Sequence, residues 1–210
     1  MSKKILILGR SGSGKSTSIR NFKKGEVGII SCVGKEMPFR TDIPVYEPKF
    51  TPETMNRYPN TLKAIKNAKT KVLVIDDANY LMSTEFMATA GEKGYDKFVD
   101  MAKHFRDLVH FVNDLDDDNK IVYFLHHTEL DADGREKCKT IGKMLDEKLT
   151  VEGCFDIVIY CADHEFYTQG NGMSTAKSPE DMFEMRIPND LKAVDVAIRE
   201  YYGMNRKEGD

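Results

Sequence analysis

The stretch "LILGRSGSGKST" (residues 6–17) places an apolar segment directly before a glycine-rich loop that ends in lysine, serine and threonine. It contains the pattern G-x-x-x-x-G-K-[ST], with Gly9, Gly14, Lys15 and Ser16 at the fixed positions. Glycines let backbone amides turn toward a bound phosphate, and the start of a following helix adds a favourable dipole. The lysine would reach the terminal phosphates, and the serine hydroxyl would bind magnesium. The pattern predicts a phosphate-binding loop between a strand and a helix.

The whole loop would line the phosphates of a nucleoside triphosphate, with contacts expected from Gly9, Arg10, Ser11, Gly12, Ser13, Gly14, Lys15, Ser16 and Thr17. Such a site also needs an acid at the end of a neighbouring strand, to hold magnesium through water. "KVLVIDD" (71–77) supplies Asp76 as the first acid after four apolar residues. Asp77 is either the next acid of the site or a cap for the segment that follows. The predicted cofactors are ATP and Mg²⁺, with Ser16 and Asp76 as metal ligands.

Composition limits the class of protein. With 210 residues, 40% hydrophobic and 31% charged, the chain can bury the core of one domain. No run approaches the roughly 18 apolar residues of a membrane span, and the apolar segment near the start is too short for a signal peptide. The four scattered cysteines are expected to be free thiols. We therefore expect a cytoplasmic protein without a membrane partner.

Alternating strands and helices predict the fold class. Strands are expected at residues 3–9, 25–33, 71–77, 120–125 and 155–161, with a short extended piece at 43–48. Helices are expected at residues 14–22, 51–70 (broken at Pro59), 95–115 and 189–202, and 164–170 with 182–188 could form a terminal antiparallel pair. This order predicts an α/β domain over residues 1–203, with a mostly parallel central sheet flanked by helices and a C-terminal antiparallel extension. Residues 204–210 are expected to be a disordered tail.

Three classes of nucleotide-binding protein fit a chain of this size. Small kinases usually carry an arginine-rich lid, but the arginines of the C-terminal half are widely spread: Arg106, Arg135, Arg186, Arg199 and Arg206. Machines of the AAA type add a helical lid domain, for which little chain remains. A RecA-like core, a single α/β domain with extra strands at its C-terminal end, is therefore favoured.

Six motifs, in their order and spacing, resemble the compact RecA-like ATPases of bacteriophages that are grouped with phage single-strand annealing proteins. They are "GRSGSGKST" (9–17), "VGKEMPF" (33–39), "VLVIDD" (72–77), "YFLHHTE" (123–129), "KMLDEKL" (143–149) and "AKSPEDMFEMRIPNDL" (176–191). The resemblance covers nearly the whole chain. It implies a RecA-like P-loop ATPase that acts on single-stranded DNA in recombination or annealing, beside a single-strand-binding protein. It also implies a homo-oligomer, either a ring or a filament, in the host cytoplasm if the protein is phage-encoded.

Candidate catalytic residues follow from this resemblance and from the ends of the strands. RecA-like enzymes place a water-activating glutamate just past the second strand, where this chain has Glu36, with Asp77 as the rival base. His126 and His127 end the next strand, at the edge where strands share a ligand crevice. Adjacent strand residues point to opposite faces, so the two histidines are poorly placed to share a zinc ion. The resemblance favours His127, with Glu129, as the γ-phosphate sensor, and His126 as a packing residue.

Basic residues after these histidines are the predicted DNA contacts. The net charge of −3 excludes a uniformly basic surface, so DNA would need a local basic strip. The segment 129–143 is expected to be a mobile loop leading to a short helix around residues 141–149. Its candidate phosphate contacts are Arg135, Lys137, Lys139 and Lys143. An ordinary solvated loop remains the alternative. Lys177 resembles the lysines that RecA-like filaments project into a neighbouring subunit's ATP.

Two other functions stay open on the sequence alone. A nucleoside or nucleotide kinase would use the same phosphate loop and magnesium acid. A nucleotide-gated binding module with little turnover would bind ATP but lack the role assigned to Glu36.

Overall fold

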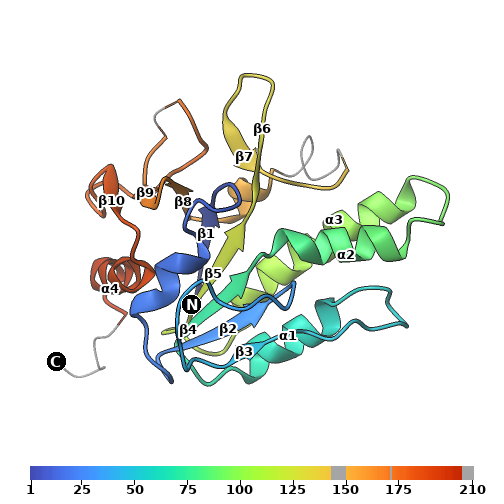
Figure 1. Ribbon diagram of the computed structural model, residues 1–210, viewed down its shortest axis with the longest axis horizontal. Helices are drawn as coiled ribbons and strands as arrows, with labels where there is room; N and C mark the ends of the chain where they lie inside the picture. Colours follow the sequence, from blue (N-terminus) through green and yellow to red (C-terminus); the bar gives the residue numbers. More distant parts are fainter. Residues whose placement is uncertain (143–149, 171, 205–210) are drawn as a thin grey trace.

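The computed structural model describes residues 1–142, 150–170 and 172–204, and its centre is an eight-stranded sheet (Figure 1). The strand order is β10-β9-β8-β1-β5-β4-β2-β3. The parallel strands are β1 (Lys3–Leu8), β2 (Val27–Ser31), β3 (Val45–Tyr46), β4 (Val72–Asp76), β5 (Ile121–His126) and β8 (Ile157–Ala162). The antiparallel strands β9 (Glu165–Tyr167) and β10 (Arg186–Pro188) extend one edge. The predicted α/β class, with a mostly parallel sheet and a C-terminal antiparallel extension, is confirmed.

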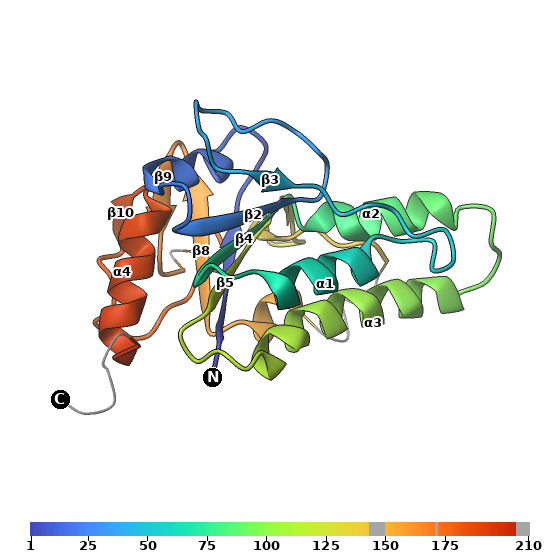
Figure 2. The same cartoon turned by 90° about the horizontal axis from the view of Figure 1, so that it is seen from below.

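Helices cover both faces of the sheet, so the central strands are apolar along their whole length. One face packs against α1 (Tyr58–Asn67), α2 (Asn79–Ala88) and α3 (Asp96–Phe111), whose buried residues join Leu6, Ile75 and Phe124 in one core. The other face packs against the 3₁₀ helix η1 (Ser16–Asn21) and α4 (Leu191–Tyr202), in a second core. Figure 2 shows α1, α2 and α3 grouped on one side of the molecule and α4 on the other.

Two helix predictions in the middle of the chain need correction. The helix expected over residues 51–70 is not divided by Pro59, because Pro59 lies in the first turn of α1, where a missing amide hydrogen costs no bond. Residues 51–57 precede the helix and close through a bridge between Thr51 and Asn56. The sequence did not predict α2, which follows β4 directly. Its buried residues Leu81, Met82 and Glu85 give no clear helical stripe of apolar positions.

The segment expected to be a mobile loop is largely a β-hairpin. Strands β6 (Thr128–Leu130) and β7 (Glu136–Cys138) pair antiparallel, directly after β5. Asp131 closes the turn, because its carboxylate accepts hydrogen bonds from the backbone amides of Asp133 (2.9 Å) and Arg135 (2.8 Å). The short helix expected at residues 141–149 falls almost entirely outside the described residues, as does the motif at 143–149. A short 3₁₀ helix, η4 (Val151–Cys154), precedes β8.

The C-terminal helix begins and ends as its sequence predicts. The carboxylate of Asp190 caps α4 by accepting hydrogen bonds from the amides of Lys192 and Ala193. Gly203 ends the helix in a left-handed conformation (φ 63°). The tail expected at residues 204–210 lies outside the described residues except for Met204. No helix within the described ranges is long and apolar enough to cross a membrane.

Candidate functional site

The carboxyl ends of β1, β5 and β4 lie side by side and build the candidate site (Figure 1). The glycine-rich loop follows β1, His127 follows β5, and Asp76 and Asp77 end β4. These residues line one cleft of about 220 Å³, together with Lys35 and Glu36 from the segment after β2. The sheet therefore brings together the predicted loop, acid, histidine and glutamate, although they come from four separate parts of the sequence.

Lys15 lies inside the curve of the loop. Its ammonium donates hydrogen bonds to the backbone carbonyls of Gly9 (2.8 Å) and Arg10 (2.9 Å). Burial lowers the pKa of Lys15, while the nearby charges of Asp77 and Asp76 oppose this shift. A buried ammonium that is held mainly by carbonyl dipoles can gain much from an anion in the cleft.

Two glycines of the motif are required by close packing. A β-carbon at Gly9 would collide with the backbone carbonyl of Cys161. Gly14 has φ +107°, and a β-carbon there would lie 2.8 Å from Nδ1 of His164. The loop is also held from behind by Asn189, whose amide donates to the carbonyl of Gly14 (3.2 Å). The loop is thus fixed against the residues that follow β8.

The regular helix expected after the loop is shorter and tighter than predicted. Residues Ser16–Asn21 form a 3₁₀ helix of six residues, and Lys15 at its start provides no side-chain cap. A helix this short has few aligned peptide dipoles, so the helix dipole is a minor part of the phosphate site. An anion bound there would depend mainly on Lys15 and on the amides of the loop.

The predicted magnesium ligands Ser16 and Asp76 are in direct contact. The hydroxyl of Ser16 donates a hydrogen bond of 2.8 Å to Oδ1 of Asp76. Burial and the neighbouring charge of Asp77 raise the pKa of Asp76 to about 6, against the opposing effects of Ser16 and Lys15. Oxygen donors are the ligands that Mg²⁺ prefers, and a divalent cation would stabilise this under-compensated carboxylate. The two residues therefore fit a magnesium ion.

Asp77 holds His127 rather than standing free in the cleft. It has a left-handed backbone (φ 57°), and its Oδ1 lies 3.0 Å from Nε2 of His127. Its Oδ2 lies 3.4 Å from the ammonium of Lys35. Burial raises the pKa of Asp77, but the hydrogen bond and charge of His127, with Lys35, outweigh burial and leave the pKa lowered. Because a carboxylate only accepts, Nε2 of His127 is the donor in this contact.

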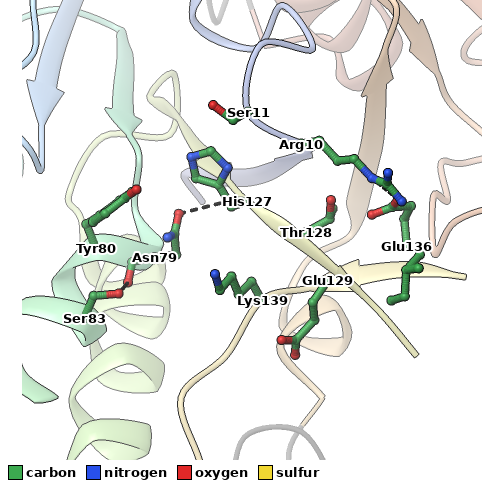
Figure 3. A pocket seen from close by; sticks show the side chains of 11 residues that line it. Arg10, Ser11, Asn79, Tyr80, Ser83, His127, Thr128, Glu129, Glu136 and Lys139 are labelled. Carbon is green, nitrogen blue, oxygen red and sulfur yellow. Dashed lines mark hydrogen bonds and ion pairs between the residues drawn. The ribbon is translucent and has the colours of Figure 1, made fainter. Parts of the chain in front are cut away.

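The two adjacent histidines have different surroundings. His126 is fully buried, donates from Nδ1 to the carbonyl of His127 (2.8 Å) and packs edge-on against Phe105 of α3, with ring centroids 5.6 Å apart. Burial lowers the pKa of His126 to about 4. The prediction that His126 packs against a helix is confirmed. His127 instead faces the cleft, and its backbone amide donates to Oδ1 of Asn79 (3.2 Å; Figure 3).

Among the described residues, no three histidine, cysteine, aspartate or glutamate side chains gather as a metal-ligating group. The two histidines engage different partners, as the alternation of strand faces predicts.

Glu36 is exposed and lines the cleft beside Lys35. The carboxylate of Asp77, which lines the same cleft, is engaged by His127 and Lys35. Of the two acids expected to activate water, Glu36 is thus the exposed one.

A second cavity, of about 440 Å³, shares Ser11 and His127 with this cleft (Figure 3). It is lined by residues of the loop, of α2 and of the β6–β7 hairpin, including Arg10, Tyr80 and Lys139. At its edge Arg10 contacts Glu136 of β7, with Nε of Arg10 2.5 Å from Oε1 of the buried carboxylate. The phosphate loop and the hairpin are therefore tied directly to each other.

The predicted DNA contacts are not equivalent. Arg135 and Lys139 are exposed on the hairpin, whereas Lys137 is partly buried and lies 3.8 Å from Glu129. Glu129, on β6, thus lies beside Lys137 on β7. The resemblance had instead named Glu129 together with His127. Lys143 lies outside the described residues.

Lys177 does not reach the cleft of its own chain. Its backbone pairs with Val158, near the amino end of β8 and away from the strand ends that form the site. Its side chain is exposed.

Several residues of the site gave no signal in the sequence. Asn189, Cys161 and His164 hold the phosphate loop from behind, and Asn79 fixes the backbone of His127. All are single polar residues remote from the loop in sequence. Only their strand-end positions could have pointed to them, since strand ends of a parallel sheet share an edge.

The chain was compared with known proteins. A scan against protein-family models gave no match, and a search of curated proteins likewise found no similar sequence.

Proposed function

We propose that this chain binds Mg-ATP in the cleft at the ends of β1, β5 and β4 and hydrolyses it. The observation that carries the proposal is the contact between Ser16 and Asp76, 2.8 Å apart, beside the buried ammonium of Lys15. This contact joins a motif serine to a strand-end acid 60 residues away, which is the pairing that a magnesium-bound triphosphate needs.

The strand order is compatible with the RecA-like ATPase that the resemblance implies. β5 lies between β1 and β4, so the strand that ends in the histidines separates the phosphate loop from the acid. This order would put a side chain at the end of the middle strand, here His127, beside the terminal phosphate.

Hydrolysis would depend on positioning and charge, since phosphoryl transfer needs little covalent help from the protein. Magnesium, when bound, would neutralise charge on the β- and γ-phosphates. Lys15 would contact the terminal phosphates, Glu36 would orient the attacking water, and His127 would contact the γ-phosphate. The hydrogen bond from His127 to Asp77 fixes the imidazole in one orientation before nucleotide binds.

Single-stranded DNA is the proposed effector, and the β6–β7 hairpin is its proposed contact. The hairpin begins directly after His127 and is tied to Arg10 of the phosphate loop through Glu136. Arg135 and Lys139 are its exposed cations. DNA phosphates bound to the hairpin could therefore affect both His127 and Arg10 of the phosphate loop. A single-strand-binding protein, a homo-oligomer and a trans-acting Lys177 remain part of the proposal through the resemblance.

Labelled ATP distinguishes this proposal from a kinase. The protein is incubated with γ-labelled ATP and magnesium, with and without nucleosides and nucleotides, and the products are separated by thin-layer chromatography. The proposal predicts free labelled phosphate, formed faster with single-stranded DNA. Label on an added nucleoside or nucleotide would establish a kinase instead. Tight ATP binding with no product would establish a nucleotide-gated binding module.

A further inference from the structure

The turn between β8 and β9 has an uncommon conformation for its residues. Asp163 (φ 49°) and His164 (φ 58°) are both left-handed, and together they form the whole connection between the two strands. Two-residue hairpins of this kind normally use Asn-Gly or Asp-Gly, because a β-carbon is strained at positive φ. Aspartate tolerates the conformation, but histidine stands where glycine would be the unstrained choice. Strain of this kind persists where the surrounding structure enforces it, often at a functional site.

The strained turn rests directly on the phosphate loop. The backbone amide of His164 donates to the carbonyl of Ser13 (3.0 Å), and the thiol of Cys161 donates to the same carbonyl (3.2 Å). Nδ1 of His164 lies 2.8 Å from the position that a β-carbon on Gly14 would take. The exposed imidazole thus stands at the edge of the loop that would hold the phosphates.

The sheet fixes the direction in which a bound nucleotide would leave the loop. β5 and β4 lie on one side of β1, and they supply His127 and Asp76 to the magnesium end of the cleft. β8 is the neighbour of β1 on the other side. A triphosphate whose γ-phosphate points toward β4 therefore directs its nucleoside toward β8.

An open cavity of about 630 Å³ lies between that side of the loop and the β6–β7 hairpin. Residues 10–13 of the loop and residues 160–164 of β8 and its turn line it, together with Leu130, Gly134 and Glu136 of the hairpin. Its size is in the range of small-ligand sites, which commonly combine aromatic walls with a few polar groups. An imidazole ring and a carboxylate at its rim are suited to a nucleobase and a ribose.

We infer that the β8–β9 turn binds the nucleoside. The imidazole of His164 stacks against the base, and the carboxylate of Asp163 accepts a hydrogen bond from the nucleoside. The inference rests on the proposed function. Stacking of a base on an aromatic ring uses the face of the base, which every base presents. The ring thus contributes affinity for the nucleoside without selecting one base.

The test compares Mg-ATP with Mg-tripolyphosphate, which carries the phosphates but no nucleoside, by calorimetry. His164→Gly removes the ring at a position whose backbone glycine adopts freely, so the folded turn is preserved. We expect wild-type protein to bind ATP more tightly than tripolyphosphate. His164→Gly should weaken ATP binding roughly 5- to 100-fold and leave tripolyphosphate binding unchanged. Its melting temperature should not fall.

A matched control makes the same change at another left-handed residue. Asp181 (φ 59°) is exposed and lines neither the loop nor this cavity, so Asp181→Gly should bind both ligands as wild type does. Unchanged ATP affinity in His164→Gly would overturn the inference. Equal weakening of both ligands would also overturn it, because the turn would then act only by supporting the phosphate loop. Wild-type protein that binds neither ligand would overturn the proposed function, and this inference with it.

Discussion

Asp76 illustrates how a residue proposed to serve the site can be costly to the fold. Its carboxylate is buried beside Asp77, with one hydrogen bond from Ser16, and its pKa is raised to about 6. The folded protein therefore holds a proton on Asp76 more strongly than the unfolded chain does. Between the unfolded pKa of about 3.9 and the folded pKa of about 6, the free energy of unfolding falls as pH rises. Above pH 6 the charged carboxylate destabilises the fold by its full amount.

Asp76→Asn should remove this penalty. Without metal, the variant should be more stable than wild type above pH 6, by up to about 3 kcal/mol, and the difference should vanish below pH 4. It should also lose magnesium-dependent ATP hydrolysis, since the charge that holds the ion is gone. Melting curves from about pH 3 to 8 in EDTA measure the effect on stability, and phosphate-release assays measure the loss of hydrolysis. A variant that hydrolyses ATP normally at ordinary magnesium would show that Asp76 is not the acid.

The adjacent histidines should respond differently to substitution. His126→Ala should lower stability by about 1–3 kcal/mol, because a buried ring packed on Phe105 is lost. His127→Ala should bind ATP nearly normally, since the loop supplies most phosphate contacts, but it should lose stimulation by DNA. Denaturant unfolding and DNA-dependent turnover separate the two variants. Equal unfolding of both, with release of a stoichiometric metal, would instead restore the zinc interpretation.

At this scale the sequence predicted residues that belong to a contiguous motif or end an apolar strand. Lys15, Ser16 and Asp76 were found in this way, and they are in fact brought together. Asn189 and His164 could not be predicted, because a single polar residue gains its role only from the loop that packs against it.

Among the elements, strands were predicted better than the segments between them. Long apolar runs such as β4 need burial on both faces, and only a sheet covered by helices provides it. The β6–β7 hairpin was missed because its strands are three residues each and are rich in charge. Pro59 was assigned as a breaker, although proline in a first turn favours the start of a helix.

The hairpin offers a test of the proposed DNA contact. Neutralising Arg135 and Lys139 to Gln should weaken single-stranded DNA binding and lower the slope of log K against log salt by about 0.7 per lost phosphate contact. Adding Lys137→Gln should change little more, because Lys137 already lies beside Glu129. DNA-binding titrations over a range of salt concentrations measure both slopes. An unchanged slope in the double variant would move the DNA site elsewhere, with the lysine-rich stretch 63–71 as the next candidate.

On the scale of the whole molecule, the order of the strands decides what the site can do. The sequence indicated parallel strands but not their order, because order depends on which crossovers pack best and not on any one segment. With β5 inserted between β1 and β4, the loop, the histidine and the acid meet at one edge, while β8 bounds the other side of the loop. In the proposed function, the terminal phosphate and the nucleoside would therefore contact opposite sides of the loop.

Calorimetric titration of Mg-ATP into wild-type and Lys15→Ala protein tests the central claim most directly. Lys24→Ala, an exposed lysine outside the loop, serves as the matched control. We predict tight binding by wild type and Lys24→Ala and loss of tight binding by a folded Lys15→Ala protein, because the terminal phosphates lose the cation inside the loop. Unchanged ATP affinity in folded Lys15→Ala would contradict the assignment of the phosphate site.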